Sequence, residues 1–439
     1  MPRRVIVVGG GVAGIAAALR LASQGVAVTL LERANRLGGR AGSFHDQALG
    51  EPIDNCQHVA LGCCSHYLDL LTQLGVERSL AWSSGFTYVE PDGRQCTLPI
   101  PAWPAPLHGL PLLARARFLT IGDRLAVALA MARLSVQKQR RWTGRSFAAW
   151  LRARRQPARA IERFWTPIVV SACNARPEDC EAGAAIKVFR DGFLRSHADA
   201  RMGVPTLPLA ELYAKTPDRL AEAGGEVRLG AHAVGVEPRA VTLRSGERLE
   251  ADAIVLATPF NITADLLDES SIEGDAIVAR LRSLKHSPIV AVHLVFDEPV
   301  TDLPHAVLLD AEFDWLFFKD GGRRVHAVAS AADSLADRPG DALVESVMRE
   351  MRSRFGVCAE PAWARAIKER RATFLVEPGS DANRPGVDAL APEVWLAGDF
   401  TATGWPATME GATRSGRAAA DAVLGHLAGR ESESIPVSP

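Results

Sequence analysis

Several features that mark membrane-spanning, secreted or nucleic-acid-binding proteins are missing from this 439-residue sequence. No run of about 18 apolar residues occurs, so a membrane-spanning helix is not expected. The first residues lead directly into a short strand pattern and lack the apolar core of a signal peptide. Positive charge is not in excess either, since 50 Lys and Arg stand against 51 Asp and Glu, and this balance argues against a nucleic-acid partner. We therefore expect a cytoplasmic protein.

The seven cysteines include no Cys-x-x-Cys pair, the spacing that is typical of zinc sites and redox dithiols. Without a secretory signal, they are expected to be reduced thiols that pack in the core or line a site. No metal site is predicted. The chain is longer than one typical hydrophobic core requires, so two closely associated domains are expected.

Residues 4–32 carry the pattern of a strand, a glycine-rich turn, a helix and a second strand. The short β-branched run Arg4–Val8 is typical of a buried parallel strand. The turn that follows has the spacing G-x-G-x-x-G, a helix rich in Ala and Leu is expected over 13–23, and a second strand over 26–31. Glu32 ends that strand at the spacing expected of an acid that contacts a ribose. The arrangement predicts a dinucleotide-binding βαβ unit.

Each position of this turn has a physical role in such a unit. Gly9 permits the tight turn, Gly11 lets the backbone approach a pyrophosphate, and Gly14 lets helix and strand pack closely. The N-terminus of the helix offers free N–H groups to the phosphates. Glu32 argues against a ribose 2′-phosphate, although Arg33 and Arg36 leave that question open. The predicted contacts are Gly9, Gly11, Val12, Ala13, Gly14, Glu32 and Arg33.

Two further segments favour FAD over NAD. A second glycine turn, Leu37-Gly-Gly39-Arg40, follows the βαβ unit and suggests additional backbone contact with phosphate or flavin. Near the other end of the chain, a strand pattern over 394–397 ends in Gly398-Asp399, and Glu410-Gly411-Ala412 opens a helix over 413–424. Arg40 is expected to contact the cofactor, with a structural salt bridge as the alternative.

Together, these motifs resemble the flavin amine oxidase and phytoene desaturase superfamily. The resemblance implies that Asp399 binds the ribityl–pyrophosphate region of FAD and that the last helix points its N-terminus at the flavin O2, where its dipole stabilises negative charge. It also implies that the backbone of Val234 meets the adenine. The contacts implied by the resemblance are Gly39, Arg40, Val234, Gly398, Asp399, Glu410, Gly411 and Ala412.

The resemblance implies an α/β fold in which a Rossmann-type FAD-binding domain carries an inserted α+β substrate domain. The FAD-binding domain is expected to be assembled from residues 1–60, 225–265 and 390–428. Residues 61–224 and 266–389 are expected to form the substrate domain, with helices over 145–195 and 340–355 and a strand-rich stretch over 285–330. A disordered tail is expected over 429–439, which is rich in Ser, Glu and Pro.

The most distinctive segment is residues 53–71. Many members of the superfamily have Asp-x-Gly at its start, whereas this chain has Asp54-Asn55-Cys56, followed by Gln57-His58. The segment closely resembles the squalene-associated FAD-dependent enzymes, the hydroxysqualene dehydroxylases of hopanoid synthesis. This narrower resemblance implies that reduced flavin converts hydroxysqualene, a hydrophobic isoprenoid substrate, to squalene.

Such a reaction needs an acid near the allylic hydroxyl group and a dry apolar channel. His58 is the first candidate for the acid because it follows the turn at Asp54, which the superfamily places near the flavin. A direct hydrogen bond from His58 to FAD or to the backbone is the alternative. Asp54 and Tyr67 are further catalytic candidates, and Asp54 could instead cap the turn.

The electron donor and the route of the substrate are less defined. Since the sequence shows no second complete nucleotide fingerprint, reduced flavin is expected to come from a partner reductase or a free flavin pool. Residues 107–134 combine apolar residues with arginines. They predict either a core helix with a solvated face or a surface helix that admits a lipid. The second option would hold the protein peripherally at the inner face of the cytoplasmic membrane.

Three other functions remain open at this stage. Oxidative desaturation of an isoprenoid needs the same cofactor and the same kind of channel. Amine oxidation is disfavoured because aromatic residues, which flank the flavin in such enzymes, make up only 6% of the chain, with three tyrosines. A non-catalytic FAD-binding scaffold for prenyl chains is the third.

Overall fold

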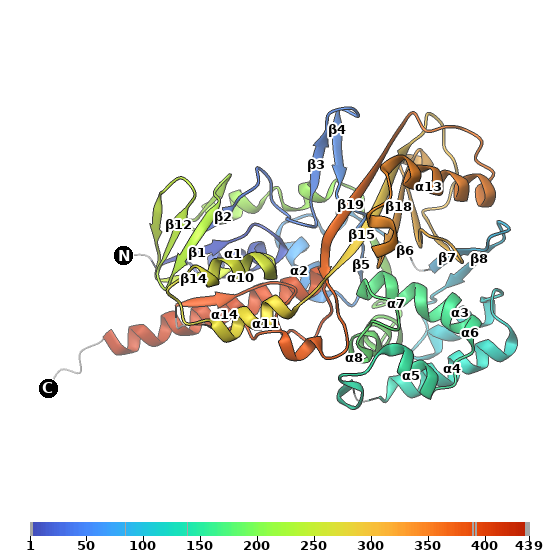
Figure 1. The fold of residues 1–439 in the computed structure, drawn as a ribbon, viewed down its shortest axis with the longest axis horizontal. Helices are drawn as coiled ribbons and strands as arrows, with labels where there is room; N and C mark the ends of the chain where they lie inside the picture. Colours follow the sequence, from blue (N-terminus) through green and yellow to red (C-terminus); the bar gives the residue numbers. More distant parts are fainter. Residues whose placement is uncertain (1–2, 84, 138, 389, 391–392, 435–439) are drawn as a thin grey trace.

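The computed structural model describes residues 3–83, 85–137, 139–388, 390 and 393–434. One part of it is built on a five-stranded parallel sheet (Figure 1). In spatial order its strands are β10 (Glu226–Leu229), β2 (Ala27–Glu32), β1 (Arg4–Val8), β14 (Ala253–Leu256) and β20 (Val394–Leu396). These strands come from three separate pieces of the chain. The predicted Rossmann-type α/β arrangement is confirmed, whereas the exact domain boundaries stay a prediction.

Two helices pack closely on this sheet because glycine faces glycine or alanine at their contacts. Helix α1 (Val12–Ala22) follows β1, and helix α14 (Met409–Ser434) lies beside it. A Cβ on Gly14 would lie 1.9 Å from the Gly9 carbonyl oxygen, and a Cβ on Gly416 would lie 2.1 Å from the Ala13 carbonyl oxygen. The packing role predicted for Gly14 therefore has a direct steric basis.

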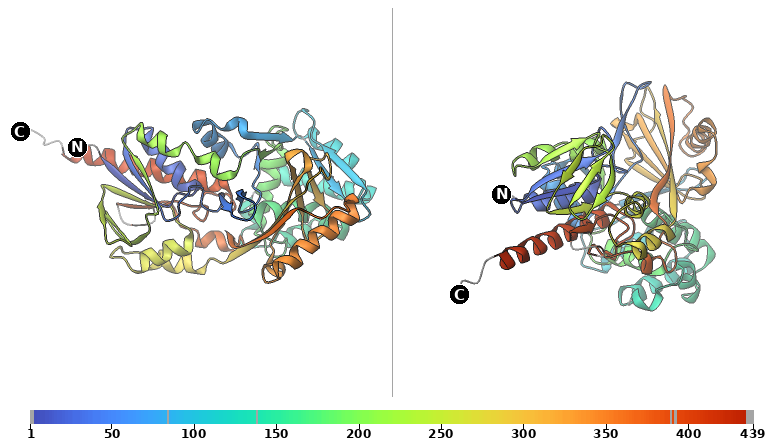
Figure 2. Two further views of the ribbon diagram at one scale, coloured as in Figure 1. Left: turned by 90° about the horizontal axis from the view of Figure 1, so that it is seen from above. Right: turned by 60° about the vertical axis from the view of Figure 1, so that its left-hand side comes forward.

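The second part is built on a seven-stranded sheet, and strands dominate 285–330 as predicted (Figure 2). In spatial order its strands are β19 (Trp363–Phe374), β15 (His286–Val295), β18 (Arg324–Ser330), β17 (Trp315–Lys319), β16 (His305–Leu308), β7 (Gly85–Val89) and β8 (Gln95–Pro99). Alternate residues face opposite sides of the sheet. Val290 and Val292 pack with Leu343 and Val347 of helix α13 (Gly340–Phe355), whereas Ile289 faces a cavity.

A layer of helices lies beside this sheet (Figure 1), and several of them line the other side of that cavity. Its main members are α3 (Leu110–Arg115), α4 (Ile121–Ser135), α5 (Phe147–Ala153), α7 (Thr166–Cys173), α8 (Ala182–Lys187) and the π-helix η5 (Val188–Leu194). Stacked aromatic rings hold it together, with the Phe147 and Trp150 ring centroids 5.3 Å apart and nearly parallel. The helical character expected over 145–195 is thus confirmed. Shorter elements include β3 (Ser43–Asp46), β4 (Glu51–Asp54), α2 (Ser65–Gln73), η6 (Leu209–Tyr213), β11 (Ala233–Glu237) and β12 (Ala240–Leu243).

Two expectations need correction. Residues 107–134 do not form one helix, because a turn that buries Ala116, Phe118 and Leu119 separates α3 from α4. The capping box of Thr120 and Asp123 then starts the second helix. The disordered tail was predicted to begin at residue 429, but α14 continues to Ser434 because no proline interrupts it before Pro436. Residues 435–439 lie outside the described part. Among the described residues, no helix is both long and apolar enough to cross a membrane.

Candidate active site

A cavity of about 900 Å³ lies between the two sheets and the helical layer. At one end it is lined by residues that lie within two positions of the ends of the parallel strands, namely Gly9 after β1, Arg33 after β2, Ala257 after β14 and Gly398 after β20. The carboxyl ends of parallel strands are where ligands of open α/β sheets bind. Within the described part of the chain, no three His, Cys, Asp or Glu side chains are grouped so as to hold a metal ion.

The glycine-rich turn has the geometry that a bound pyrophosphate requires. Gly9 has φ +112°, and a Cβ there would lie 2.6 Å from the Ala257 carbonyl oxygen. Gly11 differs, since no described atom lies within 4 Å of where its Cβ would be, so its Cα faces open space. Helix α1 starts there, and no described side chain caps its N-terminal N–H groups. These groups are left for an anion such as a phosphate.

Glu32 is buried at the same end of the cavity and is held by two backbone amides. Its Oε2 accepts a hydrogen bond from the Gly10 N–H at 2.8 Å, and its Oε1 accepts one from the Ala34 N–H at 2.7 Å. A carboxylate fixed in this way keeps free lone pairs for ribose hydroxyl groups. The residue therefore suits its predicted role.

Replacing Glu32 with alanine is expected to weaken FAD binding by at least about tenfold, because a buried charged hydrogen bond contributes roughly 1.5–3 kcal/mol. Flavin retained after desalting, measured by visible absorbance, checks this. Glu77→Ala, which removes an exposed glutamate, serves as the control. Full flavin content in Glu32→Ala would contradict the predicted contact between Glu32 and the ribose of FAD.

Arg40 and Asp399, predicted from opposite ends of the chain, form an ion pair at the cavity wall. Arg40 Nη2 lies 2.7 Å from Asp399 Oδ1, and Arg40 Nη1 donates to the Ala372 carbonyl oxygen at 2.9 Å. Both residues line the cavity. The structural salt bridge that was the alternative for Arg40 is thus present, and a cofactor contact remains compatible with it.

Glu410 also lines the cavity, but its carboxylate is engaged by the protein. It is fully buried and accepts hydrogen bonds from the Tyr67 N–H at 2.8 Å, the His66 N–H at 3.3 Å and Arg414 Nε at 2.6 Å. The two amides belong to the first turn of α2, so Glu410 caps that helix and joins it to the start of α14. This connection was not foreseen in the sequence.

Three predicted cofactor contacts are not among the described residues that line the cavity: Gly14, Val234 and Gly411. At the end of the cavity expected to hold the adenine, the wall consists of Ala231, His232 and Ala233. Val234 follows at a shift in register between β11 and β12, a bulge that leaves its backbone outside the regular strand pairing. The contacts of all fifteen residues with FAD stay predictions.

His58 lies in the cavity wall, and its ring has one fixed hydrogen bond. Its Nδ1 is 3.0 Å from the Cys56 carbonyl oxygen, which can only accept, so Nδ1 carries a hydrogen. Burial lowers the pKa of His58 below its usual value. The ring is therefore mostly neutral near pH 7, with Nε2 as an acceptor, and donation from Nε2 requires the cationic form.

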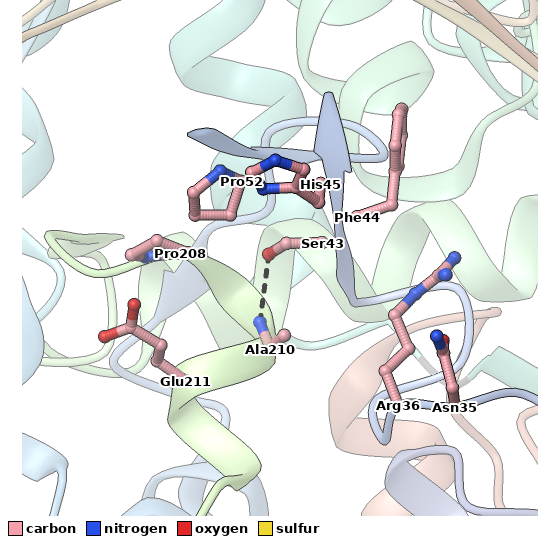
Figure 3. Close-up of a pocket in the computed structure, with 9 residues that line it drawn as sticks. All are labelled: Asn35, Arg36, Ser43, Phe44, His45, Pro52, Pro208, Ala210 and Glu211. Carbon is pink, nitrogen blue, oxygen red and sulfur yellow. Dashed lines mark hydrogen bonds between the residues drawn. The ribbon is translucent and has the colours of Figure 1, made fainter. Parts of the chain in front are cut away.

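Asp54 is not among the described residues that line the cavity, although Asn55, Cys56, Gln57 and His58 are. Its Oδ1 accepts hydrogen bonds from Ser43 Oγ at 2.7 Å and from the Leu209 N–H at 2.9 Å. Figure 3 shows that the Ser43 hydroxyl also accepts from the Ala210 N–H, at 3.0 Å, beside a smaller pocket. Asp54 thus joins β4 to helix η6, and its role in the reaction stays a prediction.

Tyr67 lines the cavity, but its hydroxyl is paired with that of Tyr213 at an O–O distance of 3.1 Å. Burial raises the pKa of Tyr67 to about 12, so the phenol stays protonated. It can act as a hydrogen-bond donor but is a weak proton donor.

An ion pair that we did not predict from the sequence also faces the cavity. Lys187 Nζ lies 2.6 Å from Asp191 Oδ2 and 4.6 Å from the centroid of the Trp405 ring, and all three residues line the cavity. Asp191 and Lys187 lie at the junction of α8 with η5, and π-helical turns are frequent at functional sites.

Comparisons with known proteins agree with this geometry. The model of the family described as flavin containing amine oxidoreductase matches residues 12–424. A hydroxysqualene dehydroxylase of Sinorhizobium fredii is 30% identical over 97% of this chain and 99% of its own. One of Rhodopseudomonas palustris is 29% identical over 97% and 99%. A 15-cis-phytoene desaturase of Glycine max is 24% identical over 96% of this chain and 80% of its own. The resemblance to hydroxysqualene dehydroxylases is thereby confirmed.

Solved structures share the fold at lower sequence identity. Putrescine oxidase bound to putrescine superposes with a TM-score of 0.74 at 15% identity and covers 97% of this chain and 99% of its own. Cyclohexylamine oxidase from Brevibacterium oxydans gives a TM-score of 0.70 at 20% identity and covers 98% and 100%. The chain therefore belongs to the family of flavin-containing amine oxidoreductases and is an FAD-dependent oxidoreductase.

Proposed function

We propose that the protein removes the hydroxyl group of hydroxysqualene and puts a hydride in its place, which yields squalene for hopanoid biosynthesis. The observation that carries the proposal is the lining of the cavity. Its glycine-rich end suits a dinucleotide, and most of the wall of the remaining part, which we call the apolar chamber, is apolar. The names of the two relatives that are 30% and 29% identical to this chain support the same reaction. The side chains lining the chamber include Phe86, Leu112, Leu113, Met131, Phe164, Ile168, Phe193, Ile289, Trp315, Phe317 and Val328.

Reduced FAD would supply the hydride at the carbon that loses oxygen. The protein contributes positioning, a proton and the exclusion of water. The apolar wall holds the hydrocarbon chain and keeps water from capturing an allylic cation as the hydroxyl group leaves. The ion pair of Arg40 with the buried Asp399 and the Glu410 cap on α2 fix the segments that border the glycine-rich end. Rigid walls of this kind are what hydride geometry requires.

The proton for the departing hydroxyl group would come from Nε2 of cationic His58. The Cys56 carbonyl oxygen orients the ring by accepting from Nδ1, and the nearby Asp54 carboxylate favours the cation, against the stronger opposing effect of burial. Lys187, whose Nζ lies 4.6 Å from the centroid of the Trp405 ring, is a second candidate for the proton donor. Reduced flavin would be supplied by a partner reductase or a free flavin pool.

Desaturation of an isoprenoid is the second candidate, because relatives at 24–26% identity are named phytoene and zeta-carotene desaturases. It would use oxidised rather than reduced FAD and the same apolar chamber. The redox state in which substrate is consumed separates the two reactions.

Two incubations of the purified holoprotein test the proposal, with lipids identified by mass spectrometry. We expect reduced holoprotein to convert hydroxysqualene to squalene, and oxidised holoprotein to leave phytoene and squalene unchanged. Formation of conjugated polyenes by the oxidised protein, with hydroxysqualene untouched by the reduced one, would establish the desaturase instead.

A further inference from the structure

Large apolar side chains are exposed mainly in one segment of the molecule. Nine are exposed among the described residues, and seven of them fall within residues 103–136. The exposed fraction is 81% for Val136, 76% for Ile121 and 67% for Leu129. We call these seven residues the entrance patch: Trp103, Leu107, Leu110, Ile121, Leu125, Leu129 and Val136. Such a concentration on one surface is typical of an interaction site rather than of scattered exposure.

Helices α3 and α4 contribute exposed leucines to the entrance patch and other side chains to the lining of the apolar chamber. Leu112 and Leu113 of α3, and Ala128 and Met131 of α4, line the cavity, while Leu125 and Leu129 of α4 face outward. Only this thin layer separates the chamber from the surroundings there. A surface helix of a water-soluble protein would normally present polar residues on its outer face.

The segment that carries the entrance patch is basic, with four arginines and one acidic residue over 103–136, and the chain that follows it is basic too. Residues 101–160 contain eleven arginines and one lysine but a single acidic residue, Asp123, in a chain whose net charge is −1. Asp123 is buried in the capping box of α4 and so does not offset the surface charge. Arg115, Arg117 and Arg133 are exposed beside the entrance patch. Apolar side chains flanked by basic ones match a bilayer that carries anionic headgroups.

We propose that the entrance patch docks onto an anionic lipid bilayer, with its apolar side chains inserted among the acyl chains and the flanking arginines at the phosphates. Figure 1 places α3 and α4 at the end of the molecule opposite β1, so the FAD-binding sheet would lie away from the bilayer. The docking proposal depends only on the entrance patch and on the basic residues around it, and not on the proposed reaction. A second step, entry of the substrate from the bilayer between α3 and α4, rests on the proposed function.

Vesicle flotation of the flavin-loaded protein tests the docking. We expect binding to vesicles of phosphatidylcholine with phosphatidylglycerol and at least tenfold weaker binding to phosphatidylcholine alone. The double substitution Leu125→Glu and Leu129→Glu should weaken binding to the anionic vesicles at least tenfold. Both side chains are exposed, so the fold should tolerate them. Leu229→Glu, at an exposed leucine outside the entrance patch, is the matched control and should bind like the wild type.

Equal vesicle binding by the wild type and the double variant would overturn the proposal, as would a wild type that binds no vesicles. A second copy of the chain is the rival occupant of the patch. If light scattering gave a dimer that the double variant converts to monomer, without vesicle binding by either, the patch would be a subunit interface.

The entry route is tested by comparing hydroxysqualene turnover in vesicles and in detergent micelles. The double variant is expected to lose at least tenfold more activity in vesicles than in micelles, because only vesicles require docking. Equal losses in both would refute the entry route. Normal vesicle binding by a wild type without turnover in either medium would leave docking intact and count against the proposed function instead.

Discussion

Substituting valine for Gly11 is expected to give a folded protein that no longer retains FAD. The backbone of Gly11 has φ −76° and ψ 177°, an extended conformation that valine adopts readily. No described atom lies within 4 Å of the Cβ position, so the apo fold should accept the side chain. The added methyl groups would occupy the space where the pyrophosphate meets the helix N-terminus. We expect the Kd for FAD to rise at least about 100-fold, or ~2.7 kcal/mol.

The measurement is flavin content together with circular dichroism and thermal unfolding of the apoprotein. Gly425→Val is the matched control, since that glycine also has no described atom within 4 Å of its Cβ position but lies on the distant part of α14. It should keep its flavin. A Gly11→Val protein that copurifies with stoichiometric FAD would contradict the placement of the pyrophosphate.

Replacing His58 with glutamine is expected to slow squalene formation by roughly 10²–10⁴-fold, the usual contribution of a general acid. Bound FAD should remain, because the pyrophosphate and ribose contacts lie elsewhere. Glutamine can still donate a hydrogen bond to the Cys56 carbonyl oxygen, so the wall should keep its shape. Single-turnover rates with hydroxysqualene, measured on flavin-loaded protein, give the effect.

The pH dependence follows from the lowered pKa of His58. Because burial holds this pKa below its usual value, the cationic form is the minor one above that pKa and grows as the pH falls. We expect the rate to rise about tenfold per pH unit as the pH is lowered toward this pKa, and to level off below it. His58→Gln should lose this dependence. If Lys187→Met abolished turnover while His58→Gln kept the wild-type profile, the acid would be Lys187.

The cofactor end of the fold was predictable because its requirements are local. The positive φ of Gly9 and the contact of Gly14 with the Gly9 carbonyl oxygen are both constraints that act within a few residues of the chain. The buried strand β1 and the acid Glu32 follow from the same short segment. The spacing of these residues in the sequence was therefore enough to predict the geometry of the cofactor end.

The interior of the cavity was not predictable in this way because its contacts join distant segments. Glu410 caps a helix that begins more than three hundred residues earlier, at Ser65. Lys187 and Asp191 are four residues apart, the spacing of an ordinary surface ion pair, and that spacing does not show that the pair meets Trp405 at the cavity wall. Likewise, the apolar pattern over 107–134 could not show which leucines face outward.

The most direct test of the proposed hydride transfer is an anaerobic single turnover. The FAD of the purified protein is reduced by light under nitrogen, hydroxysqualene is added, and flavin absorbance is followed while the lipid is identified by mass spectrometry. We predict reoxidation of the flavin with one squalene formed per flavin. Flavin that stays reduced while hydroxysqualene is recovered unchanged would contradict hydride delivery to the allylic carbon.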